Sequence, residues 1–230
     1  MMDKLTDTLF VIPARGGSKG LPGKNIKELC GKPLIAYSID VAREFVDDKH
    51  ICVSTDSEEI KQVVESYGLS LPFLRPDYLA TDTATTNDVL VHAVNFFKEQ
   101  GIEYKKLVLL QPTSPLRTSQ DVQGAIKLYH DDIDMVVSVI KSHAPAVLCS
   151  ENEDGFVELI YNKKAAGRQQ LQDMYEFNGA VYVINVQALL DKGLAKFTKR
   201  VKYVMSKENS MDIDDIYDFK LVEIILKGRG

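Results

Sequence analysis

Short apolar runs that alternate with helix-patterned segments most constrain the fold of this chain. Residues 8–13, 51–55 and 106–111 are apolar runs of strand length, and a segment with amphipathic helix spacing follows each of them. Strands that alternate with helices build βαβ units, in which the strands lie mainly parallel and helices cover the sheet. The pattern therefore predicts a three-layer α/β domain with a mainly parallel sheet.

The same pattern sets the bounds of the other elements. We expect further strands at 134–140, 179–185 and 200–206, a short strand at 71–74, and helices at 33–45, 56–68, 86–101, 119–131 and 215–226. Pro33 would occupy the first position of its helix, where its fixed φ fits. Asp56 or Ser57 would cap the following helix, and Gly68 would end it.

Residues 141–178 depart from this alternation. Two apolar segments flank an Asp154-Gly155 dipeptide, the kind of pair that closes a β-hairpin. A loop rich in Lys, Arg and Gln follows, and strand-like sequence returns at residue 179. We therefore expect one domain over residues 1–230, with a β-rich insertion at 141–178.

Composition disfavours several classes of function. The chain has 230 residues and a formal net charge of −5, which argues against nucleic acid as the main partner, because phosphate binding needs a broad basic face. Its three cysteines form no C-x-x-C pair, which argues against zinc and disulfides and favours a reducing cytosol. No apolar stretch reaches about 18 residues, so we expect no membrane span. The apolar run before Pro13 is too short for a secretory leader, and a cytoplasmic bacterial protein fits these features.

Residues 12–25, IPARGGSKGLPGKN, place glycines and cations directly after the first expected strand. Open α/β sheets bind ligands beyond the carboxyl ends of their strands, and bare N–H groups beside cations suit a polyphosphate. The glycines are Gly16, Gly17, Gly20 and Gly23, and the cations are Arg15, Lys19 and Lys24. The Walker A spacing is absent, because five residues separate Gly17 from Gly23 and Asn25 follows Lys24. The alternative is a flexible surface turn with solvated lysines.

This glycine-rich stretch resembles the signature of the CMP-sialic acid synthetases, or acylneuraminate cytidylyltransferases. Further motifs match that family in the same order, from about residue 9 to residue 226: VSTD (53–56), LRPDYLATDTATT (74–86), LLQPTSPLR (109–117), RQQL (168–171), NGAVY (178–182) and MDIDDIYDF (211–219). Relatives that load the eight-carbon sugar Kdo carry a different loop. The resemblance implies a Rossmann-like nucleotidyltransferase domain that transfers CMP from CTP to the anomeric hydroxyl of a nine-carbon acidic keto sugar and releases pyrophosphate.

The resemblance assigns the triphosphate to the glycine-rich loop. Arg15, Ser18, Lys19 and Lys24 would hold the phosphates, with Lys24 closest to the α-phosphate, and Asn25 would hydrogen-bond the ribose. Phosphoryl and nucleotidyl transfers depend on positioning and charge neutralisation more than on covalent help from the protein. The loop would therefore stabilise charge on the departing pyrophosphate.

The motif at 74–86 would form the cytosine pocket. Cytosine offers both a donor and acceptors, so its recognition needs both kinds of partner. By resemblance, Arg75, Thr86 and the backbone near Ala84 contact the base. The alternatives are that Arg75 lies in a surface turn at a strand end and that Thr85 or Thr86 only caps a helix.

Asp212 and Asp214 would bind Mg²⁺, or Mn²⁺ in its place, by the same resemblance. Two carboxylates at i and i+2 of an extended segment point the same way, and hard cations prefer oxygen ligands. Asp214 would serve catalysis together with Lys24 and Arg15. The alternative is that Asp214 or Asp215 caps the last helix.

Gln111, Arg168, Asn178 and Tyr182 would contact the sugar. The amide of Gln111 can donate and accept hydrogen bonds, and Arg168 would bind the sugar carboxylate through two parallel ones. In the family, the insertion that carries this arginine also forms a dimer contact, so we expect a homodimer. Tyr182 could equally belong to the core. Arg117 reads as a surface charge at a helix entry, and we assign it no role.

The match is weaker on the sugar side. Many family members have a lysine shortly after an H-x-P element, where this chain has Val147, and some have an arginine before NGA, where it has Glu176 and Phe177. Loss of cations alters a pocket for an acidic sugar. N-acetylneuraminic, legionaminic and pseudaminic acids are therefore all candidate substrates. A P-loop kinase or NTPase and a nucleotide-sensing domain without catalysis are the competing interpretations.

Overall fold

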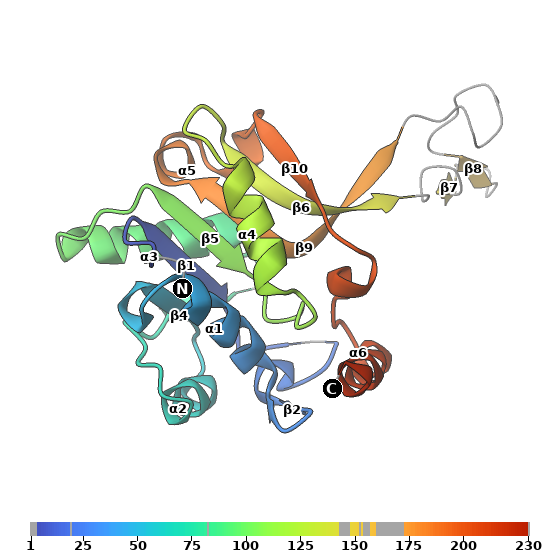
Figure 1. The fold of residues 1–230 in the computed structure, drawn as a ribbon, viewed down its shortest axis with the longest axis horizontal. Helices are drawn as coiled ribbons and strands as arrows, with labels where there is room; N and C mark the ends of the chain where they lie inside the picture. The colour runs from blue at the N-terminus through green and yellow to red at the C-terminus, as the bar shows by residue number, and fades with distance from the viewer. Residues whose placement is uncertain are drawn as a thin grey trace.

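The computed structural model describes residues 4–18, 20–81, 83–142, 148–151, 153, 157–159 and 173–229. One six-stranded sheet forms its centre, with the strand order β10-β6-β9-β5-β1-β4 (Figure 1). The strands are β1 (Thr8–Pro13), β4 (Ile51–Ser54), β5 (Lys106–Leu110), β6 (Met135–Ser142), β9 (Met174–Asn185) and β10 (Arg200–Val204). Every strand expected outside the insertion is present except the one at 71–74.

The sheet is mainly parallel, as the sequence predicts. β1 runs parallel to β4 and β5, and β6 runs parallel to β10. β9 lies between the two parallel groups and is antiparallel to both β5 and β6. β9, which follows the insertion, thus pairs antiparallel with β6, which precedes it.

Helices cover both faces of the sheet. α1 (Leu34–Phe45), α2 (Glu58–Ser66) and α4 (Ser119–Leu128) pack on one face, and α3 (Thr86–Glu99) and α5 (Val186–Lys192) pack on the other. Alternate residues of β1 serve the two layers, since Phe10 and Ile12 belong to the first and Leu9 and Val11 to the second. A strand buried on both sides reads as a continuous apolar run. The arrangement confirms the three-layer prediction.

The last helix, α6 (Ile216–Gly228), is fixed by a third apolar cluster. Phe219 and Val222 of α6 pack with Leu34 at the start of α1, with Leu116, and with Ile213. Two short strands, β2 (Glu28–Leu29) and β3 (Lys32–Pro33), lead into α1. This cluster places residues 211–215 close to the loops that follow β1 and β5.

Several boundaries differ from the sequence predictions. Pro33 precedes α1 as its N-cap instead of occupying its first position, and Ser57, not Asp56, caps α2 through the N–H of Ile60. Residues 71–74 form a loop, and α5 was not expected, because seven residues carry too short a hydrophobic pattern to identify a helix. No helix in the described part of the chain is long and apolar enough to cross a membrane.

The insertion contains the expected hairpin. β7 (Cys149–Glu151) pairs antiparallel with β8 (Val157–Leu159), while the Asp154-Gly155 dipeptide lies outside the described residues. β9 begins at Met174, earlier than predicted, because its first residues pair with the end of β6. Figure 1 shows the ends of β6 and β9 projecting from the body of the molecule toward β7 and β8.

Candidate active site

A cavity of about 590 Å³ lies beyond the carboxyl ends of β1 and β5. Among the residues that line this central cavity are many of the predicted site residues: Arg15, Ser18, Lys24, Asn25, Arg75, Ala84, Thr86, Gln111 and Asp214. Leu79 and Val89 add apolar surface on the side of α3. Lys19 and Arg168 lie outside the described residues. The structure thus brings the motifs after the first and third parallel strands into one chamber.

The glycine-rich loop folds tightly against the start of α2. The N–H of Gly16 donates to Asp56 Oδ1 at 3.0 Å, and the N–H of Ser18 donates to Gly16 O at 3.0 Å. A Cβ on Gly16 would lie only 3.0 Å from the Cβ of Ser57, so a side chain there would have to push Ser57 aside, whereas glycine fits without that shift. Asp56 ends the VSTD motif; the sequence suggested it only as a possible helix cap and did not predict its bond to the glycine-rich loop.

The second half of the loop turns at Gly23, whose φ of 66° lies in the left-handed region that favours glycine. A 3₁₀ turn, Lys24–Ile26, follows. Within it, Asn25 is buried, and its Nδ2 donates to Arg15 O at 3.2 Å. The Asn25 side chain therefore ties the two ends of the loop together, which holds Arg15 and Lys24 at the cavity.

The glycine-rich loop meets the acidic segment at Lys24. Lys24 Nζ donates to Ile213 O at 2.8 Å and lies 3.8 Å from Asp214 Oδ1. A Cβ on Gly20 would lie 2.4 Å from Asp214 O, which is closer than any side chain allows. The two motifs lie far apart in the sequence but form one wall of the cavity.

Asp212 and Asp214 share one side of an extended segment. Both are exposed, whereas Ile213 between them is fully buried. The N–H of Ile213 donates to Thr113 O at 2.8 Å, and Ser114 Oγ contacts Asp212 Oδ1 at 3.3 Å, so the loop after β5 supports the segment. Because alternate residues of an extended segment point to the same side, both carboxylates can reach one cation.

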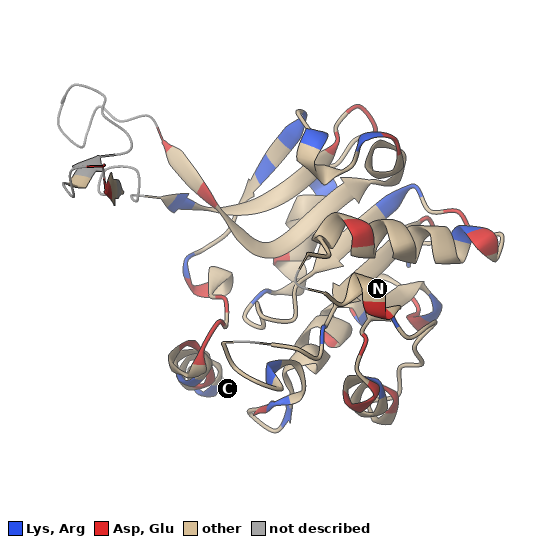
Figure 2. Cartoon of the chain, turned by 180° about the vertical axis from the view of Figure 1, so that it is seen from behind, with Lys and Arg blue, Asp and Glu red and all other residues tan. Residues whose placement is uncertain are grey.

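Helix capping does not compete for these two carboxylates. Asp215 is the N-cap of α6, where its Oδ1 accepts hydrogen bonds from the N–H groups of Tyr217 and Asp218. The side chain of Asp214 is 85% exposed. Figure 2 shows the run of acidic residues that leads into α6. Asp215 therefore caps the helix, while Asp214 lines the cavity.

The donor set suits a hard cation that also binds phosphate. In the described part of the chain, no group of three or more His, Cys, Asp or Glu side chains could hold a metal ion. Mg²⁺ does not need such a cage, because it binds one or two carboxylates, several waters and substrate phosphate oxygens. Asp212 and Asp214 beside a cationic loop fit that pattern.

Arg75 is buried beside the cavity and does not lie in a surface turn. Only 5% of the residue is exposed. Its Nε donates to Ser54 Oγ at 3.0 Å, its Nη2 donates to Ser54 O, and its backbone N–H donates to Thr55 O at 2.7 Å. Burial lowers the pKa of the guanidinium, while the charge of Asp56 opposes that effect. The end of β4 thus fixes Arg75 in one orientation.

The threonines at the start of α3 divide their roles. Thr85 is the N-cap, and together with Asp88 it forms a capping box, in which each side chain accepts a hydrogen bond from the other residue's backbone. Thr86 is the first residue of the helix and lines the cavity. The alternative that Thr86 is only a cap is therefore wrong.

The predicted sugar residues occupy different surroundings. Gln111 lines the cavity at the end of β5. Tyr182 is partly buried in β9; burial raises the pKa of its hydroxyl, and the charge of Asp212 raises it further. The amide of Asn178 is already bonded, since its Oδ1 accepts from Ser138 Oγ and its Nδ2 donates to Ser210 Oγ. Neither Asn178 nor Tyr182 is among the cavity-lining residues.

Comparisons with known proteins agree on one family. The family model described as cytidylyltransferase matches residues 9–154. An N-acylneuraminate cytidylyltransferase of Escherichia coli is 38% identical over 98% of this chain, which spans about half (53%) of that relative's length. A CMP-N,N'-diacetyllegionaminic acid synthase of Legionella pneumophila is 34% identical over 95% of this chain and 96% of its own.

A solved structure shows the same fold. It is CMP:2-keto-3-deoxy-manno-octonic acid synthetase complexed with CTP, which superimposes with a TM-score of 0.72 at 17% sequence identity. The match covers 97% of this chain and 99% of that one. At this identity the likeness concerns the fold alone, and it supports the mainly parallel α/β architecture.

Proposed function

This chain belongs to the cytidylyltransferase family, and from that premise we propose that it transfers CMP from CTP to the anomeric hydroxyl of a nine-carbon acidic keto sugar. The observation that carries the proposal is the central cavity, where a cationic glycine-rich loop meets Asp214 and a buried arginine, while Asp212 lies two residues before Asp214 and is not among the cavity-lining residues. The hydroxyl oxygen forms a bond to the α-phosphorus and gives up its proton. The bond between the α- and β-phosphates breaks, and pyrophosphate leaves.

The glycine-rich loop binds the triphosphate in this proposal. Lys24 approaches the α-phosphate, Arg15 and Ser18 hold the outer phosphates with Lys19, and Asn25 bonds the ribose. Because Asn25 already holds Arg15 O through Nδ2, its Oδ1 is the atom that would accept from a ribose hydroxyl. Cations held in place before the reaction stabilise developing negative charge without reorganising.

The cytosine ring lies between α3 and Arg75. Ser54 holds two of the Arg75 nitrogens, and within the described residues this leaves Nη1 to donate toward the base. Thr86 and the backbone near Ala84 complete the polar edge, and Val89 packs against the ring. A guanidinium fixed in one plane gives directional hydrogen bonds, which distinguish one base from another.

Mg²⁺, or Mn²⁺ in its place, binds to Asp212 and Asp214 in this proposal. When bound, the cation would neutralise phosphate charge and polarise the reacting oxygens. The protein contributes the orientation of both carboxylates through Ser114, Thr113 and the buried Ile213 side chain.

The sugar would lie beside Gln111, with Arg168, Asn178 and Tyr182 on the same side. Asn178 would act through its place in β9, because its amide is bonded to Ser138 and Ser210. The sugar is N-acetylneuraminic acid or a bacterial relative such as legionaminic or pseudaminic acid. The absence of the two family cations, and the likeness to the Legionella enzyme, favour testing the relatives alongside the sialic acid.

A homodimer is the assembly we propose. The two strands of the hairpin are three residues each, and an isolated two-stranded ribbon of that length is not stable in water. Large apolar side chains are exposed at Val157 on the ribbon, at Leu148 just before it, and at Phe177 in β9. A second copy that covers this ribbon would bury them.

The experiment that tests the function combines purified protein, CTP and Mg²⁺ with a panel of nine-carbon keto acids. The proposal expects one equivalent of pyrophosphate for each CMP-sugar formed, with at least one member of the panel. A kinase or NTPase would release other products, and a nucleotide-sensing domain would bind CTP without turnover. Either result would overturn the proposal.

A further inference from the structure

Arg117 is buried next to the loop after β5, although its place at a helix entry predicts a surface charge. Only 3% of the residue is exposed. Its Nη1 donates to Gln111 O, Ser114 O and Ala180 O, each at 3.2 Å, and its Nη2 donates to Ser38 Oγ at 2.6 Å. One guanidinium therefore ties the loop after β5 to β9 and to α1.

The first two of these acceptors lie in peptide bonds that precede prolines. Gln111 precedes Pro112, and Ser114 precedes Pro115, so neither peptide bond has an N–H that could anchor it. The direction of a carbonyl relative to its Cα is set by ψ. Gln111 O also accepts from Ser38 Oγ at 3.4 Å and from the N–H of Ser114 at 3.3 Å, and Ser114 O accepts from the N–H of Arg117 at 3.4 Å. The guanidinium of Arg117 adds the charged donor to both oxygens and so helps to set ψ of Gln111 and of Ser114, and with it the directions of their side chains.

The loop in turn supports the acidic segment. Ser114 Oγ contacts Asp212 Oδ1 at 3.3 Å, and Thr113 O accepts from the N–H of Ile213 at 2.8 Å. Arg117 thus bonds the backbone of Gln111, whose side chain faces the proposed sugar, and through Ser114 it is two hydrogen-bonded steps from Asp212. Arg117 does not itself line the cavity.

A buried cation is a costly way to fasten a loop. The guanidinium donates to three carbonyls and one hydroxyl, and its Nε has no hydrogen-bond partner among the described residues. Burial lowers the pKa of Arg117 to about 10, so the side chain stays charged at neutral pH. Hydrogen bonds from a charged donor are stronger and more directional than those from neutral groups, which suits a loop whose geometry must be held.

We propose that Arg117 is a positioning residue, which sets Gln111 for the sugar and, through Ser114 and Thr113, sets the carboxylates of the acidic segment. The proposal rests on the proposed function for its kinetic consequences. Its structural consequence, the coupling of Arg117 to the segment at 212–214, holds for any ligand of the cavity.

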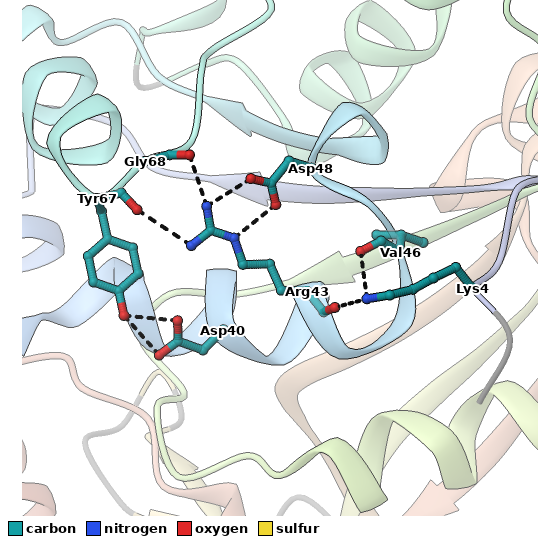
Figure 3. Close-up of polar contacts among 7 residues, drawn as sticks. All are labelled: Lys4, Asp40, Arg43, Val46, Asp48, Tyr67 and Gly68. Atoms are coloured by element: carbon teal, nitrogen blue, oxygen red, sulfur yellow. Dashed lines mark hydrogen bonds and ion pairs between the residues drawn. The ribbon is translucent and has the colours of Figure 1, made fainter. Parts of the chain in front are cut away.

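Arg43 provides a matched control, which Figure 3 shows. Its guanidinium also makes several hydrogen bonds, to both carboxylate oxygens of Asp48 and to the carbonyls of Tyr67 and Gly68. It joins α1 to the end of α2, and it is not among the residues that line the central cavity. Arg43→Met and Arg117→Met each remove a guanidinium with several hydrogen bonds; that of Arg43 is partly exposed and paired with Asp48, and only that of Arg117 reaches the site.

Kinetics on the full chain test the proposal. For Arg117→Met we expect the KM for sugar and the Mg²⁺ concentration for half-maximal rate to rise about tenfold or more, while the KM for CTP stays within about twofold. Ser38→Ala, which removes one acceptor of Arg117 and a hydroxyl that itself donates to Gln111 O at 3.4 Å, should shift the same parameters less, and it serves if Arg117→Met does not fold. Arg43→Met should lower the melting temperature and leave all three constants unchanged. Equal effects of Arg117→Met and Arg43→Met would overturn the proposal.

Hydrogen exchange provides a readout that needs no substrate. In Arg117→Met or Ser38→Ala, the amide of Ile213 should exchange faster than in the wild type, whereas the amide of Arg75 should not change. Unaltered exchange at Ile213 would contradict the coupling even if turnover fell. Faster exchange at Ile213 in the variants would support the coupling even if the wild type made no CMP-sugar. In that case the proposed function fails, and the structural part of the proposal stands.

Discussion

The ammonium of Lys24 lies between the glycine-rich loop and the segment that precedes α6. It donates to Ile213 O and is 3.8 Å from Asp214 Oδ1. Because Asp214 is largely exposed, water screens this ion pair, and it contributes little to stability. An incoming phosphate can therefore replace Asp214 as the partner of the Lys24 ammonium with little loss of free energy. The bond to Ile213 O keeps Lys24 pointed at the cavity.

Asp214→Asn should lower kcat by about 100-fold or more and leave CTP binding largely in place, because it removes a proposed ligand of the cation but none of the cationic loop. Steady-state kinetics and calorimetric titration with CTP measure the two effects. Asp215→Asn is the matched control, since asparagine caps a helix as well as aspartate does. Full activity of Asp214→Asn at limiting Mg²⁺ would contradict the metal role.

Gln111→Ala should raise the KM for sugar about tenfold, because the variant loses roughly one hydrogen bond to the sugar. The KM for CTP should change much less. Gln187→Ala, which removes an amide bonded to Asp191 on α5, should change neither constant. Kinetics with each substrate varied in turn measure the effect. A larger shift for CTP than for sugar would move Gln111 to the nucleotide side.

Single residues show what the sequence could reveal. The family resemblance singled out Lys24, Arg75 and Asp214, and all three side chains line the central cavity. The sequence did not reveal the burial of Arg117 or the bond from Asp56 to the glycine-rich loop. Both depend on contacts between segments that no local pattern records.

At the scale of elements, the site depends on close contact between the glycine-rich loop and the segment before α6. The packing of Phe219 and Val222 holds α6, and the bond from Ile213 N–H to Thr113 O holds the segment against the loop after β5. The arrangement of parallel strands was predictable from apolar runs. The early start of β9 was not, because pairing with β6 rather than sequence pattern extends that strand.

Gly20→Ala should separate the two motifs. Its Cβ would lie 2.4 Å from Asp214 O, so backbone must shift, at a cost of about 1–3 kcal/mol in unfolding free energy and with a loss of turnover. Gly17→Ala is the control for stability, since a Cβ there meets nothing within 4 Å. Urea unfolding of both variants measures the difference. Equal stability of the two would contradict the close packing.

Asp134, which directly precedes β6, should make the stability of the folded chain depend on pH. Burial alone would raise its pKa, but hydrogen bonds from Lys192 and from the N–H groups of Lys199 and Thr198 lower it to about 2. A depressed pKa stabilises the fold above the unfolded value of 3.8 and loses that effect as pH falls toward 2. The ionised carboxylate of Asp134 contributes up to about 2 kcal/mol to the free energy of unfolding at neutral pH, and about half of this contribution is lost by pH 3.

Asp134→Asn tests this dependence. The variant should be less stable than the wild type at pH 7, and the difference should shrink as pH falls from 5 to 3. Urea unfolding at a series of pH values measures both. A difference that stays constant over that range would show that the carboxylate does not titrate as described.

For the whole molecule, the cavity lies beyond the carboxyl ends of β1 and β5. The ribbon of β7 and β8 lies away from the body of the molecule (Figure 1). Figure 2 shows Lys and Arg interspersed with Asp and Glu around the helices and loops, so the cations of the glycine-rich loop are a local feature. A local cationic site on a chain of net charge −5 suits a small polyanion. The ribbon leaves apolar side chains without cover in a single copy.

The homodimer predicts a mass of twice 25.8 kDa in sedimentation equilibrium. Val157→Lys should shift the equilibrium toward the monomer, because Val157 is 73% exposed on the ribbon and a charge there would have to be buried in the dimer. Ile102→Lys, on the loop after α3, should leave the mass unchanged. A wild type that sediments as a monomer at all concentrations would contradict the proposed assembly.

A crystal structure of the chain with CTP and Mn²⁺ tests the central claim most directly. Anomalous scattering locates the metal independently of the nucleotide. The account predicts manganese at Asp212 and Asp214, triphosphate oxygens against residues 15–24, and cytosine beside Arg75. Phosphates bound away from the glycine-rich loop, or manganese away from both aspartates, would contradict it.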